Sequence, residues 1–308
     1  MRDFKLRPGA GWAGPVLGMK MPSYAGLRDP VSTFTQNIKR VHGFGTLLSN
    51  LIVPIMVIEQ AKEQARHLYK PDAGIALLDF QEQEINSALA KHRTDLDQMA
   101  DGAMPSAYFT NLTNGAYNYV QQISNWNGTT TEALNAWFAA QITGVWTALE
   151  VLFEDLWVAA LNGHPSILAE LRGRSDKKTV ALSRLVQVGF ETKNAMGSIL
   201  GADQNFSKLD GAMEAYKLAF SEDNEVILQI MGSPDFHLLA CIRNIIVHSS
   251  SFYDEAYLSN VKSISAAPRG DVGEKLMLDG AVVDQVLRAA LSKSVELIAA
   301  IDRWLASN

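Results

Sequence analysis

Apolar residues recur at helical spacing over most of this chain, and that pattern limits the folds open to it. The clearest stretch is residues 281–305, where apolar side chains return every three or four positions: Val282, Val283, Val286, Leu287, Leu291, Val295, Ile298, Ile301 and Trp304. Such spacing gives a helix one continuous apolar face. Similar patterns predict helices over residues 32–70, 73–99, 129–161, 177–200, 205–220, 224–231 and 234–249, with a kink or break at Pro54.

One short region departs from the helical period. Residues 261–264 and 275–278 flank the turn-forming sequence Pro268-Arg269-Gly270, which predicts a hairpin. The expected fold class is therefore all-α, a helical bundle with one short β-hairpin near the C-terminus.

Glycine and proline mark the expected divisions of the chain. They crowd the first thirty residues, so we expect an irregular N-terminal arm over residues 1–30. Residues 105–130 are rich in Asn, Thr, Tyr and Gly, and Asn125-Trp126-Asn127-Gly128 is a turn signal. We place a boundary there, between a helical region of unknown role (31–130) and a C-terminal domain (131–308).

The composition excludes several classes of protein. With 47% apolar residues the chain has enough apolar surface to offset the entropy of ordering, so it is not disordered. Its single cysteine, Cys241, excludes an internal disulfide framework and a zinc site built of several thiolates, and fits a reducing compartment. Ser49, Asn50 and Pro54 interrupt the most apolar stretch, Leu47 to Ile58, which is shorter than the ~20 residues that span a bilayer. We expect a buried helix there, no membrane partner and a cytoplasmic location.

Charge gives no general attraction to nucleic acid. Residues 131–308 hold 15 basic and 22 acidic side chains, a net charge of −7. An RNA partner would therefore need a local basic site. Arg172, Arg174, Lys177, Lys178 and Arg184 form either such a site or a solvated loop.

The segment most informative about function is residues 233–248. Ser233 and Pro234 are typical of a helix start. At about 100° per residue, Asn244 and His248 fall within about 140° of Arg243. The opposite face is aliphatic: Leu238, Leu239, Ile242, Ile245 and Ile246. One face would pack into a core while the other presents a guanidinium, an amide and an imidazole.

These side chains suit metal-free RNA cleavage. A guanidinium binds phosphate and stays charged at physiological pH. An imidazole transfers protons near neutrality, and an amide can orient the substrate. Spacing alone favours a structural interpretation instead, a histidine at a helix end beside a solvent-reaching arginine.

Arg243-Asn244-Ile245-Ile246-Val247-His248 resembles the Arg-Asn-x-x-x-His signature of HEPN domains (higher eukaryote and prokaryote nucleotide-binding). The resemblance covers residues 131–308. It includes a preceding long helix with an inward acid, Glu150, and a following Ser/Asp-rich stretch that leads to a final amphipathic helix. Residues 1–130 carry no such resemblance.

The resemblance implies a helical bundle that pairs as a homodimer and acts as a metal-independent endoribonuclease in toxin–antitoxin, phage-defence or RNA-processing roles. It implies that His248 is the general base or acid, Arg243 the phosphate clamp and Asn244 the orienting residue. RNA and an antitoxin or other protein are the implied partners, and no cofactor is expected. Ser249-Ser250 departs from the Asn or Gly that many members place after the histidine, which leaves open whether the loop admits RNA.

Glu150 borders the apolar face of its helix and has two open interpretations. It could reach Arg243 and orient it, or tune His248. Alternatively it belongs to an ordinary solvated stripe with Thr143, Thr147 and Glu154.

Other patterns have simpler structural explanations. His237, Cys241 and His248 share a stripe, but one helix seldom completes a metal site, so no metal is expected. Cys241 is better explained as a small core residue than as a nucleophile. The aromatics could stack bases or pack domains: Tyr108, Tyr117, Tyr119, Trp126 and Trp137.

Two functional alternatives remain beside the nuclease. One is a non-catalytic HEPN module that binds RNA, a nucleotide or a protein. The other is a helical assembly protein in which residues 1–130 serve oligomer packing.

Overall fold

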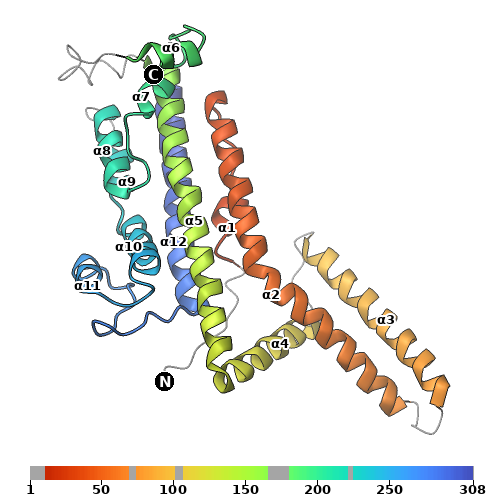
Figure 1. The fold of residues 1–308 in the computed structure, drawn as a ribbon. Helices are drawn as coiled ribbons and strands as arrows, with labels where there is room; N and C mark the ends of the chain where they lie inside the picture. Colours follow the sequence, from red (N-terminus) through yellow and green to blue (C-terminus); the bar gives the residue numbers. More distant parts are fainter. Residues whose placement is uncertain (1–10, 69–73, 101–106, 166–179, 221–224, 308) are drawn as a thin grey trace. The chain divides into compact units, whose positions relative to one another are not determined.

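A computed structural model describes residues 11–68, 74–100, 107–165, 180–220 and 225–307 (Figure 1). All the named elements in these ranges are helices, which confirms the all-α fold class. In chain order they are α1 (Gly14–Leu17), the 3-10 helix η1 (Ala25–Leu27), α2 (Arg28–Leu68), α3 (Gly74–Ala100), α4 (Ala107–Trp126), α5 (Gly128–Gly163), α6 (Leu182–Gln187), α7 (Met196–Gly201), α8 (Leu209–Ala219), α9 (Glu225–Met231), α10 (Pro234–His248), α11 (Glu255–Asn260) and α12 (Gly280–Ser307).

The described residues form two compact units. Unit 1 takes in residues 44–134, and unit 2 takes in residues 9–43 and 135–308. The helices α2 and α5 each contribute to both units. The expected division into separate domains at residue 130 stays a prediction.

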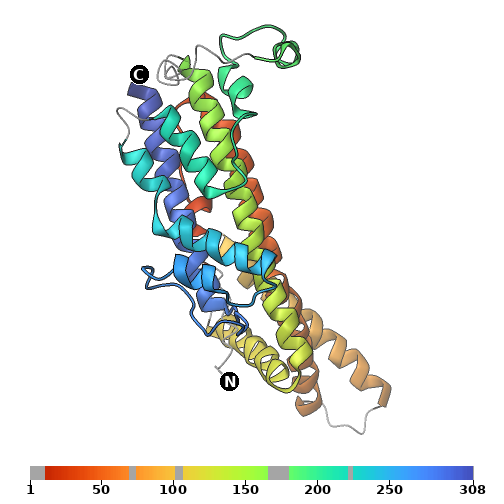
Figure 2. The same ribbon diagram turned by 60° about the vertical axis from the view of Figure 1, so that its left-hand side comes forward.

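In unit 1, α3 runs alongside the second half of α2 (Figures 1 and 2). Val53 and Val57 of α2 pack with Ala116 of α4, because their four-residue spacing puts them on one helical face. Partly buried residues of α2 and α3 pack against this cluster: Ile52, Met56, Ala88 and Leu89. The opposite face of α2 exposes Leu47, Leu51 and Ile55.

This exposure corrects the expectation of a buried helix at Leu47 to Ile58. The packing of α3 and α4 described above covers one face of that stretch, so Leu47, Leu51 and Ile55 remain exposed. The helix also continues through Pro54 rather than breaking there.

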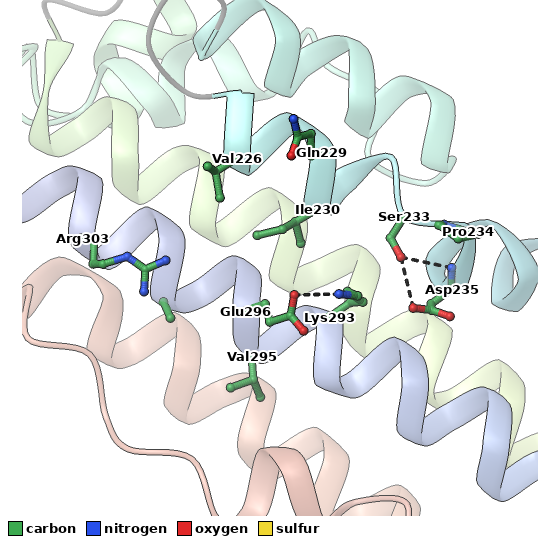
Figure 3. A pocket seen from close by; sticks show the side chains of 11 residues that line it. Val226, Gln229, Ile230, Ser233, Pro234, Asp235, Lys293, Val295, Glu296 and Arg303 are labelled. Atoms are coloured by element: carbon green, nitrogen blue, oxygen red, sulfur yellow. Dashed lines mark hydrogen bonds and ion pairs between the residues drawn. The ribbon is translucent and has the colours of Figure 1, made fainter.

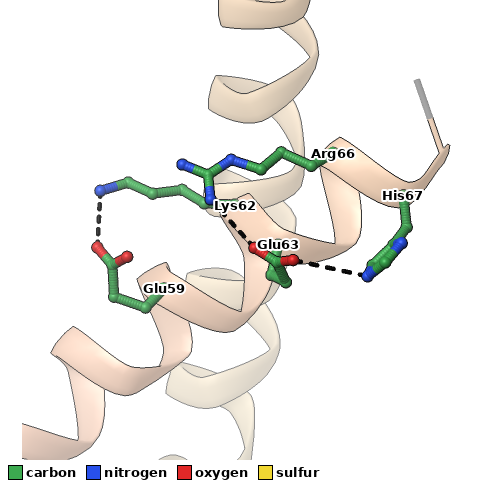
Figure 4. A network of polar contacts seen from close by, with 5 residues as sticks. All are labelled: Glu59, Lys62, Glu63, Arg66 and His67. Atoms are coloured by element: carbon green, nitrogen blue, oxygen red, sulfur yellow. Dashed lines mark hydrogen bonds and ion pairs between the residues drawn. The ribbon is translucent and has the colours of Figure 1, made fainter. Parts of the chain in front are cut away.

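Charged side chains follow the apolar stretch on the last turns of α2 (Figure 4). Lys62 Nζ donates to Glu59 Oε1 at 2.8 Å, and Arg66 donates to Glu63 Oε2 at 3.1 Å. The Lys62 hydrogen bond and charge lower the pKa of Glu59. These pairs are exposed, and such pairs contribute little to stability.

Unit 2 is built around α5 and α12. Within it, α12 packs against α1, α9 and α10. Aromatic side chains fill the space between α5 and the later helices: the Phe153 ring meets Phe236 of α10 edge-on at 5.1 Å, and Trp157 Nε1 donates to the Ala215 carbonyl of α8 at 2.9 Å. Figure 2 shows α8 to α11 following one another along one side of this unit.

The predicted β-hairpin is not seen in the described residues; Phe252 and Lys275 form only an isolated antiparallel bridge. The Asp254 side chain caps α11 by accepting from Tyr257 N at 2.7 Å, so the chain leading to residue 261 becomes helical. The second half of the expected hairpin pairs elsewhere. Leu276 N donates to the Ser251 carbonyl at 2.6 Å, and Leu278 N donates to Asn135 Oδ1 at 2.8 Å.

Two other regions differ from the sequence expectation. Residues 107–126 form the helix α4 despite their Asn, Thr and Gly content. The expected helix at 177–200 begins outside the described residues; from residue 180 onward the chain forms two short helices, α6 and α7, separated by a turn in which Gly189 and Phe190 have positive φ.

In the part of the chain that the structure describes, three helical stretches are long and apolar enough to cross a membrane by length and composition: Ala25–His67, Gly128–Gly163 and Glu225–His248. Of the most apolar 18 residues in each stretch, 56% are buried within the structure in Gly128–Gly163 and 50% in Glu225–His248. Only 12% are buried in Ala25–His67. The cytoplasmic location and the lack of a membrane partner stay predictions.

Candidate functional site

The helix α10 begins at a well-formed cap. The Ser233 hydroxyl accepts a hydrogen bond from Asp235 N at 3.1 Å, and Pro234 occupies the first turn, where its missing N–H is not needed. An acid in the first turn also suits the positive end of the helix dipole. The sequence therefore specifies where α10 starts.

One face of α10 packs into the core of unit 2. Leu238, Leu239, Ile242 and Ile245 are buried, and Ile246 is half-buried. This burial fixes how α10 is rotated about its axis. Its remaining face is therefore held at a fixed orientation toward the surface.

Arg243 lies at the edge of that face, with 25% of its side chain exposed. Its Nη1 donates to Asn244 Oδ1 at 3.1 Å, and its Nη2 lies 4.0 Å from Glu150 Oε1. The Nε atom is buried and finds no hydrogen-bond partner within the described part of the chain. The guanidinium is thus oriented by its neighbours, with its Nη atoms toward an amide and a carboxylate.

Glu150 reaches α10 from the middle of α5, and 18% of its side chain is exposed. Its Oε1 accepts a hydrogen bond from Trp146 Nε1, one turn earlier on α5. Of the two interpretations of Glu150, the geometry brings it to Arg243. The donor role of Trp146 was missed in the sequence, where its i,i+4 spacing from Glu150 is the only signal.

His248 is the last residue of α10 and is exposed, as is Asn244. Among the residues described, none hydrogen-bonds the His248 ring or pairs with it. The structure therefore joins Arg243, Asn244 and Glu150 by contacts and leaves His248 on the same helix, open to solvent.

The turn after His248 is closely hydrogen-bonded. Ser249 Oγ donates to Asp254 Oδ2 at 2.7 Å. The hydrogen bond from Tyr257 N and the one from Ser249 lower the pKa of Asp254. Asp254 therefore holds both the end of α10 and the start of α11. This turn also exposes Phe252, which the sequence did not single out.

The other residues on α10 do not form a ligand site. His237 Nε2 lies 3.3 Å from the Asn260 carbonyl and 3.6 Å from Cys241 Sγ. Cys241 is buried, and burial followed by the charge of Asp210 raises the pKa of its thiol to about 11. That fits a core residue rather than a nucleophile. No group of three or more metal-ligating side chains occurs in the ranges that the structure describes.

Of the basic cluster, only Arg184 lies within the described residues; Arg172, Arg174, Lys177 and Lys178 lie outside them. Arg184 makes a bidentate pair with Asp203, at 2.9 and 2.8 Å, and so has a structural partner. Among the aromatics, Tyr119 and Trp126 are exposed on α4 in unit 1, and Trp137 packs on Phe138 in unit 2.

A separate groove lies between α9, the start of α10 and α12 (Figure 3). Its volume is about 730 Å³. Lys293 donates to Glu296 at 2.7 Å, and Ser233 to Asp235 at 3.2 Å, so these polar groups are satisfied by one another. None of the motif residues of α10 lines this groove, and we place no chemistry there.

The motif end of α10 offers an oriented cation, an exposed amide and an exposed imidazole on one rigid helix. That set can bind an anionic group and exchange a proton with it. Comparisons with protein-family models, with curated proteins and with solved structures find no match for this chain.

Proposed function

We propose that this chain is a HEPN-like, metal-independent endoribonuclease. The observation that supports it most is the two-sided character of α10. Its aliphatic face is buried, while Asn244 and His248 are exposed and Arg243 lies oriented between the two faces.

In the proposed reaction the neutral His248 imidazole takes the proton of a ribose 2′-hydroxyl. The 2′-oxygen then attacks the adjacent phosphorus, the bond to the 5′-oxygen breaks, and that oxygen takes a proton from water or from the imidazolium of a second copy. The products are a 2′,3′-cyclic phosphate end and a 5′-hydroxyl end. Arg243 stabilises the charge on the phosphoryl oxygens, Asn244 orients the substrate, and Glu150 positions Arg243.

A homodimer belongs to this proposal. Within one chain no hydrogen bond or ion pair of the described residues joins His248 to Arg243, so a second copy would complete the site. The cytoplasmic location, an antitoxin or other protein partner, and a role in toxin–antitoxin, defence or RNA-processing systems are part of the same proposal.

The test is incubation of the purified protein with total RNA in EDTA. A single-stranded DNA whose sequence matches one RNA of that mixture is incubated in parallel. We expect the RNA to be cut, the DNA to stay intact, and the new ends to carry 2′,3′-cyclic phosphate. Intact RNA, or cutting that needs a divalent metal, would contradict the proposal.

A non-catalytic RNA-binding module is the second candidate. One observation favours it: the carboxylate of Glu150 lies beside Arg243 and offsets part of the charge that a phosphate would meet. This candidate predicts no cleavage, together with salt-sensitive RNA binding that Arg243→Ala abolishes.

A further inference from the structure

The turn directly after His248 holds an unusual backbone. Ser250 and Ser251 have φ of 50° and 68°, a region that residues with a side chain rarely occupy. Three hydrogen bonds hold it in place: Ser251 N to the Ile245 carbonyl at 3.0 Å, Leu276 N to the Ser251 carbonyl at 2.6 Å, and Phe252 N to the Ser249 carbonyl at 2.8 Å. Strain of this kind persists only where the surroundings impose it, and it is common at binding sites.

This turn exposes the ring of Phe252 at the surface. Its neighbours Ser251 and Tyr253 are buried, yet Phe252 is 45% exposed. Phe252 is bridged to Lys275, whose ammonium lies 6.0 Å from the ring centroid. The backbone hydrogen bond from Phe252 N to the Ser249 carbonyl holds Phe252 in the turn that follows His248.

An exposed aromatic ring beside an ammonium has the chemistry of a nucleotide subsite. A base stacks on the ring whatever its sequence, and the cation attracts the adjoining phosphate. A base inside a duplex already stacks on its neighbours, so such a subsite takes a single strand.

We propose that Phe252 and Lys275 form a base-stacking subsite for single-stranded RNA, next to the phosphate that Arg243 and His248 act on. This inference rests on the proposed function for its ligand and adds the substrate class. The competing role for the same ring is a contact between two copies of the chain, because Val247 and Met277 are exposed as well.

The test measures equilibrium binding of the full chain to a short single-stranded 2′-O-methyl RNA, which cannot be cut because its attacking oxygen is blocked, and to the matched duplex. We compare Phe252→Ala, Phe252→Trp and a control, Phe190→Ala. Phe190 is 61% exposed and lies on the turn between α6 and α7. The molar mass of each protein in solution is also measured by light scattering, which reports its oligomeric state.

We expect Phe252→Ala to weaken single-strand binding about tenfold or more, the scale of one lost stacking contact. Phe252→Trp and Phe190→Ala should bind as the unchanged protein does, and the duplex should bind more weakly in every case. Lys275→Gln should make binding less sensitive to salt.

Equal single-strand binding by Phe252→Ala and the unchanged protein would overturn the subsite, as would weakened binding by Phe252→Trp. Dissociation of a dimer in Phe252→Ala with unchanged RNA binding would assign the ring to the contact between copies. Because the probe is not cleaved, the two proposals fail separately: Phe252-dependent binding without cleavage of ordinary RNA would overturn the nuclease and keep the subsite.

Discussion

The guanidinium of Arg243 has two polar neighbours with opposite effects on a bound phosphate. Asn244 accepts from Nη1 and so orients the group without changing its charge. Glu150 lies 4.0 Å from Nη2, which holds the guanidinium in place and also competes with an anionic ligand. Because Trp146 holds Glu150, the orientation depends on α5 as well as on α10.

The buried thiol of Cys241 gives a prediction at this scale. Burial raises its pKa to about 11, so near pH 8 the native protein holds almost no thiolate. We expect a thiol-specific reagent to react far more slowly with the native chain than with the chain unfolded in urea. Equal rates in both states would show that the thiol is accessible and that α10 is not packed as described.

Asp302 gives a second prediction. Burial of this carboxylate raises its pKa. Hydrogen bonds from Tyr24 N and from the amide and hydroxyl of Ser23, at 2.8 to 2.9 Å, together with the charge of Arg303, outweigh that effect and lower the pKa. We expect Asp302→Ala to lower the free energy of unfolding by about 1–2 kcal/mol, measured by urea denaturation. The control is Asp284→Ala on the same helix, which removes only an exposed i,i+4 pair with Arg288 and should cost about 0.5 kcal/mol or less.

The sign of the pH dependence follows from the lowered pKa of Asp302. Its contribution is complete above the pKa of the unfolded chain, near 3.8, and is lost as the pH falls through the lower folded value. The difference between Asp302→Ala and the unchanged protein should therefore shrink in acid. A difference that stays constant to the lowest pH at which the protein folds would contradict this account.

At the scale of the element, glycines report how closely the helices approach. A Cβ added at Gly197 in α7 would lie 2.2 Å from the backbone carbonyl oxygen of Val158 in α5, whereas one added at Gly43 in α2 meets nothing within 4 Å. We expect Gly197→Ala to destabilise the chain by about 1–3 kcal/mol through overpacking. Gly43→Ala should stabilise it by up to about 1 kcal/mol through helix propensity.

Thermal unfolding of these two glycine variants is the measurement. A midpoint for Gly197→Ala equal to that of the unchanged protein would mean that α7 does not dock on α5 as described.

Helical periodicity predicts those helices whose own residues show the three- to four-residue apolar repeat. The helices α2, α3, α5, α8, α9, α10 and α12 each match an expected range. It fails at α4, where Asn, Thr and Gly indicate a loop although Ala116 packs on α2. It also fails at the hairpin, because Asn135 lies 143 residues before Leu278, whose amide it accepts.

Part of the candidate site also follows from local sequence patterns, and part depends on tertiary packing. The order of Arg243, Asn244 and His248 along one helix, and the aliphatic face opposite, follow from spacing alone. The approach of Glu150 to Arg243 depends on how α5 packs against α10, which no local pattern encodes. The exposure of Phe252 depends likewise on the distant partners of residues 275–278.

At the scale of the whole molecule, the candidate site lies entirely in unit 2. Unit 1 contributes none of the residues discussed for catalysis, and its exposed face on α2, with Leu47, Leu51 and Ile55, has no assigned role. The proposed chemistry therefore depends on unit 2 and on its pairing with a second copy.

The most direct test of the central claim compares two histidines of the same helix. His248 is exposed at the motif end of α10, while His237 lies beside the Asn260 carbonyl and the buried thiol of Cys241. The measurement is the rate of RNA cleavage in EDTA by the unchanged protein, His248→Ala and His237→Ala, each confirmed folded by circular dichroism. The account predicts a loss of about 10²–10⁴-fold for His248→Ala, the scale of a general base, and a near-normal rate for His237→Ala. Equal cleavage by His248→Ala and the unchanged protein would contradict it.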